Sequence, residues 1–301
     1  MGYILAVTAV YLWSLNLIIA SYFADKLTPF EIAFGRWLIA SIILLPFTVK
    51  GIIKYRATLL KHWKFMVVLA ISGIVINNTL IYFAGETSSA TDMSILGVTG
   101  PLFIVVLSWI WDKSPIKSLQ VLGLFSACIG VLLIISKGNI ENLKTIKPVV
   151  GNFWMLLNCF IFAVYSILQT KAPKELSQSV LLEVSAIIGT IILLPLMLYT
   201  TPSSQLINLT NEDIKVIVYL GLANSVIAFL AWNIAIGKIG SIKTGIIYYL
   251  MPLFGGIEAH HYLGEDLYMA ELIGGLFILA GVIFTTLADV RKIDESKIKK
   301  Q

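Results

Sequence analysis

Apolar residues dominate ten stretches of this sequence, and polar residues gather in the short segments between them. An α-helix of about twenty residues crosses the roughly 30 Å hydrocarbon core of a bilayer. The pattern therefore predicts an all-α integral membrane protein with ten transmembrane helices. The predicted spans are residues 2–23, 30–49, 65–84, 92–111, 116–136, 149–170, 180–200, 214–236, 244–263 and 268–289.

Two of these spans contain an interior proline in the same local sequence. Pro252 begins a Pro-Leu-Phe triplet in the ninth span, and Pro101 begins the same triplet in the fourth span, 151 residues earlier. Proline removes a backbone donor, but membrane helices tolerate it because neighbouring helices can satisfy the freed carbonyl. Both prolines are therefore candidate hinges, with simple packing kinks as the alternative.

Further matches at similar offsets indicate that the chain is an internal repeat. Gly123 and Gly130 match Gly274 and Gly281 at the offset of 151, and residues 39–46 match residues 188–195 at an offset of 149. The predicted organisation is a first five-helix repeat at residues 1–148, a second at 149–289, and a basic tail at 290–301. Because each unit has an odd number of spans, the second copy is inverted. Many secondary transporters have this plan, with a substrate site near the midplane between the repeats.

Composition agrees with a membrane protein. Of the 301 residues, 58% are hydrophobic and only 13% are charged, against about 25% charged in soluble domains. The net charge of +5 does not indicate a nucleic-acid partner, because the basic residues lie in short loops. Cys128 and Cys159 lie inside apolar spans, so no disulfide framework is expected. The first span lacks a basic leader region and is expected to be retained.

The distribution of lysine and arginine predicts the orientation. With the N-terminus in the cytoplasm, the inner segments hold sixteen of the twenty-two Lys and Arg residues and the outer loops hold five. Cytoplasmic loops carry an excess of these residues. We therefore expect a multi-pass protein of the cell inner membrane with both termini in the cytoplasm.

Several of these features together resemble a known family. The ten spans in two units, Arg36 early in the second span, and the helix-proline-helix segment before Gly264-Glu265 are similar to the drug/metabolite transporter superfamily, in its EamA branch. The resemblance covers the whole chain, but the branch is usually aliphatic or aromatic where this sequence has residues 258–261. It implies two EamA-like repeats and a transporter. No cofactor is expected, because the sequence has no cofactor-binding glycine loop.

Polar side chains inside the spans are the candidates for substrate contact, because they are costly in lipid and usually face a cavity or a partner. The alternative for any one of them is a hydrogen bond that joins two helices. As a set they predict a central, aromatic-lined cavity with amide groups. The residues expected to bind substrate are Trp13, Asn16, Asn78, Tyr82, Tyr165, Trp232, Tyr248 and Tyr249.

Two charged residues are expected at a similar depth in the outer half of the membrane. Arg36 and Glu258 would pair with each other if the second and ninth helices meet there. Glu86 and Asp92 are the competing partners for Arg36. If one of them binds Arg36, Glu258 becomes a candidate proton carrier with His261 one turn away, and a purely structural hydrogen bond is the remaining alternative.

The sequence favours a secondary transporter for small polar organic metabolites such as amino acids, acting as an exporter by alternating access. No P-loop or catalytic triad is present, so the energy source would be a proton or an exchanged solute. We expect lipid and a small-molecule substrate as partners, no nucleic acid, no metal, and a monomer or homodimer. The alternatives are a lipid flippase of the same fold and, less favoured, a membrane metalloenzyme that uses the Glu258-x-x-His261 spacing.

Overall fold

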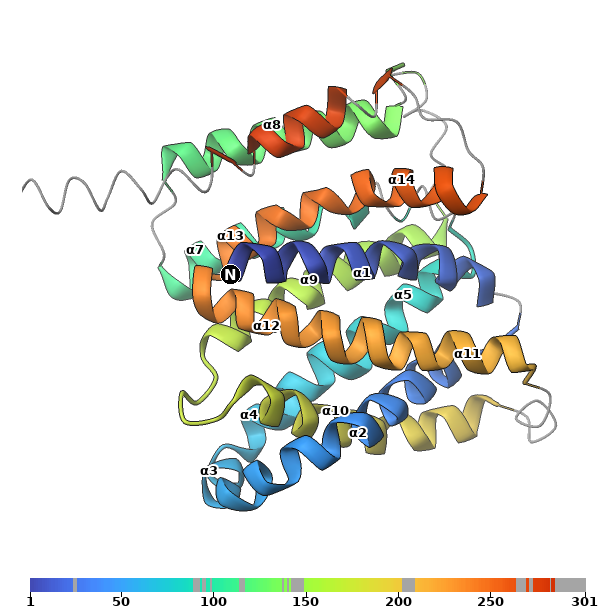
Figure 1. Ribbon diagram of the computed structural model, residues 1–301, viewed down its shortest axis with the longest axis vertical. Coiled ribbons are helices and arrows are strands. Elements are labelled where there is room, and N and C mark those ends of the chain that lie inside the picture. Colours follow the sequence, from blue (N-terminus) through green and yellow to red (C-terminus); the bar gives the residue numbers. More distant parts are fainter. Residues whose placement is uncertain are drawn as a thin grey trace, which may run out of the picture.

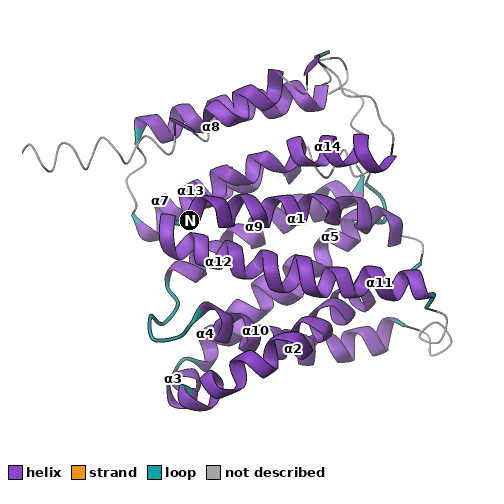
Figure 2. Ribbon diagram, in the orientation of Figure 1, coloured by secondary structure: helices purple, strands orange, loops and turns teal. Residues whose placement is uncertain are grey.

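The computed structural model describes residues 1–23, 26–88, 93, 96–97, 99–113, 117–136, 138–139, 141, 149–201, 209–263, 269–270, 273–281 and 283–284. The described chain is built from helices and turns and contains no strand (Figure 2). Six of its helical segments are long and apolar enough to cross a membrane. The predicted all-α membrane fold is therefore confirmed.

Each predicted span falls on helical residues, the tenth through residues 273–281 of the described part. The third, eighth and ninth spans are each divided into shorter labelled segments. In the first half the elements are α1 (Gly2–Phe23), α2 (Pro29–Lys54), α3 (Arg56–Lys61), α4 (Trp63–Ala70), η1 (Ile71–Ile76), α5 (Asn77–Gly85), α7 (Thr99–Asp112) and α8 (Ser118–Ser136). In the second half they are α9 (Val150–Thr170), α10 (Gln178–Thr200), α11 (Asn211–Tyr219), η3 (Leu220–Ile227), α12 (Ala228–Ile239), α13 (Ser241–Ile247), η4 (Tyr248–Leu250) and α14 (Met251–Leu263).

Side-chain caps fix the start of the second helix of each half. The Thr28 hydroxyl accepts from the backbone N–H of Glu31 at 3.3 Å, and the Glu31 carboxylate accepts from the N–H of Thr28 at 2.6 Å. Ser177, 149 residues later, accepts from the N–H of Val180 at 3.3 Å. These bonds satisfy amide groups that have no partner within the helix. The sequence offset thus places a cap at the same point in both halves.

The third and eighth spans each contain a π-helical turn in the middle, η1 and η3. Such turns are rare, interrupt the α-helical hydrogen-bond ladder and occur often at functional sites. The ninth span is also interrupted, by the 3₁₀ turn η4, and Pro252 is the second residue of the helix that follows. Proline is well tolerated at the start of a helix, where its missing N–H has no partner to lose.

The helices of the two halves pack mainly on each other. α1 lies against α12, α5 lies against α9, and α2 lies side by side with α10 at one end of the bundle (Figure 1). At the other end, residues 273–281 lie along α8, where the Ser126 hydroxyl donates to the carbonyl of Phe277 at 2.8 Å. Gly130 there approaches the backbone of Gly274 so closely that a side chain on Gly130 would collide with it.

Large apolar side chains cover the outside of the bundle. Phe47, Phe125 and Tyr199 are 81%, 64% and 91% exposed. Exposed apolar surface on this scale is unfavourable in water and indicates contact with lipid or another protein. The buried interior instead holds many polar side chains, and these form the candidate site.

Candidate functional site

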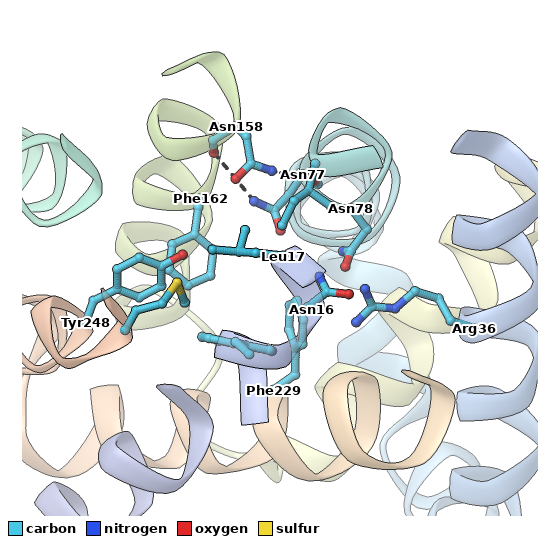
Figure 3. A pocket seen from close by; sticks show the side chains of 12 residues that line it. Asn16, Leu17, Arg36, Asn77, Asn78, Asn158, Phe162, Phe229 and Tyr248 are labelled. Carbon is cyan, nitrogen blue, oxygen red and sulfur yellow. Dashed lines mark hydrogen bonds between the residues drawn. The ribbon is translucent and has the colours of Figure 1, made fainter. Parts of the chain in front are cut away.

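A small cavity of about 40 Å³ lies at the centre of the bundle, between helices of both halves. A single water molecule occupies roughly 10–15 Å³ of cavity volume measured in this way. The cavity therefore has room for a group of a few atoms in this conformation. Its wall combines one cation, four amides and several aromatic rings (Figure 3). The lining residues are Trp13, Asn16, Leu17, Arg36, Asn77, Asn78, Ile81, Asn158, Phe162, Phe229, Tyr248 and Met251.

Arg36 is held on one side of the cavity by neutral hydroxyl groups. Its Nε donates to the hydroxyl of Ser225 in η3 at 2.8 Å, and its Nη1 donates to the hydroxyl of Tyr82 in α5 at 2.8 Å. The Tyr82 hydroxyl in turn donates to Oδ1 of Asn16 in α1 at 3.2 Å. We call these four residues the Arg36 network. It joins helices of both halves around one buried positive charge.

Three amides of the wall, two on α5 and one on α9, bind backbone groups of their neighbours. Nδ2 of Asn77 donates to the carbonyl of Asn158, and Nδ2 of Asn158 donates back to the carbonyl of Asn77. Nδ2 of Asn78 donates at 2.6 Å to the carbonyl of Gly73, inside the π-helical turn η1. A backbone carbonyl of the π-helical turn is therefore satisfied by a side-chain amide. The side-chain oxygens of these three amides have no hydrogen-bond donor among the described residues and are available to the cavity.

Aromatic rings close the side of the cavity formed by α9, α12 and η4. The Trp13 ring lies 5.3 Å from Trp232 and 5.2 Å from Phe229, and the Phe162 ring lies 5.1 Å from Trp232 and 5.7 Å from Tyr248. Most of these contacts are tilted or edge-to-face, the arrangements that aromatic rings favour. A solute in the cavity could not leave on this side unless the rings separated.

A second polar cluster lies behind these rings. The Tyr165 hydroxyl in α9 lies 3.0 Å from Oδ1 and 2.8 Å from Nδ2 of Asn233 in α12. Nε1 of Trp232 donates to the hydroxyl of Ser166 at 3.2 Å. We call these four residues the Tyr165 network. Its members are all neutral, and none of them lines the cavity.

Comparison with known proteins identifies the family. The EamA-like transporter family matches residues 1–136 and again residues 149–287. The chain belongs to the EamA-like transporter family. It is a multi-pass membrane transporter and not an enzyme.

Individual relatives of this transporter agree with that assignment. An uncharacterized transporter of Archaeoglobus fulgidus is 30% identical over 277 residues, which cover 91% of this chain and 93% of the relative. The uncharacterized transporter YyaM of Bacillus subtilis is 28% identical over 286 residues, which cover 94% and 92%. A solved crystal structure shares the fold with a TM-score of 0.77 at 17% identity, covering 96% of this chain and 98% of that one.

The structure of this EamA-like transporter brings together many of the predicted substrate residues, though not all of them. Trp13, Asn16, Asn78 and Tyr248 line the cavity. Tyr82 lies behind Asn16 in the Arg36 network, and Tyr165 and Trp232 lie in the Tyr165 network. Tyr249 lies apart, because its hydroxyl is 3.3 Å from Sγ of Cys128 in α8.

Arg36 and Glu258 do not pair in this structure. Arg36 donates to Tyr82 and Ser225, while Glu258 is 2% exposed on α14. Neither carboxylate oxygen of Glu258 has a hydrogen-bond partner among the described residues. Ser14, which lies beside Glu258, donates its hydroxyl to the carbonyl of Tyr11. Asp92 and the side chain of His261 lie outside the described residues, and so does the predicted Glu-x-x-His spacing as a whole.

The two proline positions differ in the structure. The helix is interrupted directly before Pro252, at η4, and Tyr248 of that turn lines the cavity. Pro101 is the third residue of α7, and residue 98, which directly precedes α7, is not described. A hinge at Pro252 would move a residue of the cavity wall, so it remains the better-placed candidate of the two.

Sequence reasoning missed three features of the wall. Phe162 and Phe229 are apolar residues among many apolar residues, and nothing in the pattern distinguishes them. Ser225 was missed because serine is common in membrane helices, and its role depends on Arg36, 189 positions away. The bonds between Asn77 and Asn158 were missed as well, because they join residues 81 positions apart.

Proposed function

We propose that this EamA-like transporter is a secondary active carrier for small polar organic metabolites, such as amino acids or related compounds. It works by alternating access in the cell inner membrane, with both termini in the cytoplasm, and it exports its substrate. The observation that carries the proposal is the buried cavity, whose wall holds an arginine, four amides and a set of aromatic rings.

The position of the cavity supports alternating access. Its wall is shared between α1, α2 and α5 of the first half and α9, α12 and α14 of the second. Rocking of one half against the other would therefore open the cavity to one side at a time, as in carriers built from inverted repeats. The two ranges matched by the family, 1–136 and 149–287, support the same division of the chain.

The arrangement of basic segments supports the orientation. The N-terminus, α3 and the turn between α12 and α13 all lie on the left side of the bundle as drawn in Figure 1. Arg56, Lys61 and Lys238 belong to these segments. Export as the direction is part of this proposal.

The decisive experiment is flux through the purified protein in liposomes. We expect efflux of labelled amino acids from preloaded vesicles under a proton gradient, and loss of most of that flux in Trp13→Ala, which removes a ring of the cavity wall. The matched control is Trp109→Ala, whose side chain is 60% exposed on α7 and which should transport normally. Lipid movement without solute flux would instead support a flippase.

The orientation has a separate test. After Cys128 and Cys159 are replaced by alanine, a single cysteine at position 56 should react with a membrane-impermeant maleimide only after the cells are opened. Ready labelling of intact cells would reverse the orientation.

A further inference from the structure

We infer that Arg36 is the anion-binding group of the cavity, and that the transported solutes carry a carboxylate. The inference rests on the proposed transport function and narrows it to one chemical class of substrate.

Arg36 is a buried cation without a counter-ion among the described residues. Its side chain lies seven residues into α2, about 10 Å along the helix at 1.5 Å per residue, and the residue is only 1% exposed. No carboxylate of the described residues forms an ion pair with it. Arginine does not lose its proton in proteins, so the positive charge remains in the interior.

The guanidinium group also has unused hydrogen-bond donors. Arginine carries five N–H donors, and the described residues accept two of them, through Ser225 and Tyr82. Both acceptors are neutral hydroxyl groups. The remaining N–H groups belong to the end of the side chain that lines the cavity, where Figure 3 shows it beside Asn16 and Asn78.

A carboxylate is the group that best matches this end of the cavity. Two parallel N–H groups of one guanidinium can bind both oxygens of a carboxylate, and such charge-assisted pairs are stronger than neutral hydrogen bonds. The Asn16 amide adds donors, because its oxygen is occupied by Tyr82 while its Nδ2 has no acceptor among the described residues. The cavity volume of about 40 Å³ is enough for a group of this size.

Three amides on α5 and α9 provide acceptors for the rest of the solute. The side-chain oxygens of Asn77, Asn78 and Asn158 can accept from an ammonium or hydroxyl group of the same molecule. Aromatic faces of Trp13 and Tyr248 also line the cavity and attract a cation. A small amino or hydroxy acid satisfies both ends, whereas an organic cation without a carboxylate leaves Arg36 unpaired.

The test compares matched solutes and matched variants in proteoliposomes. Threonine and threoninamide differ only at the carboxyl group, and the same pairing extends to serine, alanine and lactate with their amides. We expect flux of at least one acid to exceed that of its amide more than tenfold in the native protein. Arg36→Lys should keep part of this preference, and Arg36→Gln should abolish it.

A second variant keeps the test valid if Arg36→Gln fails to fold. Asn16→Asp places a permanent carboxylate beside Arg36. We therefore expect a higher melting temperature of the variant protein and weaker inhibition of labelled-solute flux by added free acid. Asn139→Asp makes the same change outside the cavity and should affect neither. A carboxylate-specific rise in melting temperature provides a binding measurement that does not depend on flux.

The outcomes separate the two proposals. Equal flux of acids and amides, or an unchanged KM for acids in Arg36→Gln, overturns the anion site and leaves the transport function standing. A carboxylate-specific thermal shift without any flux rejects transport and supports the anion site. Absence of both flux and thermal shift rejects the two together.

Discussion

The Arg36 network and the Tyr165 network contain the same kind of bond at corresponding positions of the two halves. Residues 16 and 165 are separated by 149 positions, and residues 82 and 233 by 151, the offsets found in the sequence repeat. In the first half an amide on α1 accepts from a phenol on α5. In the second half a phenol on α9 meets an amide on α12. The residue types are exchanged, while the bond between the helices is kept.

The two networks differ in charge. Arg36 corresponds at the offset of 149 to Ser185, whose hydroxyl has no hydrogen-bond partner among the described residues. The Arg36 network thus carries a cation and faces the cavity, whereas the Tyr165 network is neutral and does not line it. The comparison separates two features: the amide–phenol bond joins helices in both halves, whereas the buried positive charge is confined to the first half.

The largest loss of stability is expected from a substitution at Gly73, which packs against Tyr165. The Tyr165 ring packs on the backbone of Gly73 so closely that a Cβ there would overlap its ring carbons. We expect Gly73→Ala to destabilise the protein by about 3 kcal/mol, because the backbone of η1 or the ring must move. Thermal unfolding followed by size-exclusion chromatography measures the effect.

Gly237 provides the control for that substitution. A Cβ on Gly237 would meet nothing within 4 Å, so Gly237→Ala should be neutral or stabilise by up to about 1 kcal/mol. Equal stability of the two variants would show that the contact between Gly73 and Tyr165 is not tight.

Removal of the two phenol hydroxyls, one in each network, tests the consequence of the difference in charge. Tyr82→Phe takes an acceptor from a buried guanidinium, and Tyr165→Phe breaks a bond between neutral groups. Hydrogen bonds to charged groups contribute about 1.5–3 kcal/mol and neutral ones about 0.5–1.5. Chemical unfolding in detergent should therefore show Tyr82→Phe to be the more damaging change. A larger loss in Tyr165→Phe would contradict the assignment of the two networks.

Glu258 lies outside both networks. Its replacement tests whether coupling of solute flux to protons depends on a residue outside them. Glu258→Gln removes a buried carboxylate whose oxygens have no partner among the described residues. If this group carries the proton, flux driven by a pH gradient should fall severalfold, while exchange of labelled for unlabelled solute continues. Unchanged pH-driven flux would leave Glu258 with a structural role alone.

The smallest effect is expected at Tyr249. Its hydroxyl meets Cys128 and does not line the cavity. Tyr249→Phe should therefore change the KM of any transported solute by less than about twofold and cost at most about 1 kcal/mol of stability. A large rise in KM would return Tyr249 to the binding site.

The positions of the helices could be predicted from sequence because apolar length alone defines a membrane span. Local geometry was less accessible. The turns η1 and η3 each contain one unusual hydrogen-bonding pattern that leaves the apolar pattern unchanged. Tyr248 and Tyr249 illustrate another limit, since neighbouring residues on a helix point in different directions and only one of them could face the cavity.

Partners of the buried polar groups could not be predicted for a different reason. Arg36 was expected beside a carboxylate, because opposite charges attract most strongly in a medium of low polarity. Its observed partners are hydroxyl groups on Tyr82 and Ser225, 46 and 189 positions away. Such pairings depend on how the two halves fit together, which a single sequence does not specify.

The glycine contact between α8 and residues 273–281 bears on the order in which the chain can be assembled. The ribosome synthesises α8 long before residue 273, so the contact of Gly130 with Gly274 cannot form until residues 273–281 have been made. The close approach of Gly130 to Gly274 forms when residues 273–281 enter the membrane. Residues 273–281 thus complete the packing of α8 after the helices between them have been synthesised, and a chain that stops before residue 273 leaves Gly130 without this neighbour.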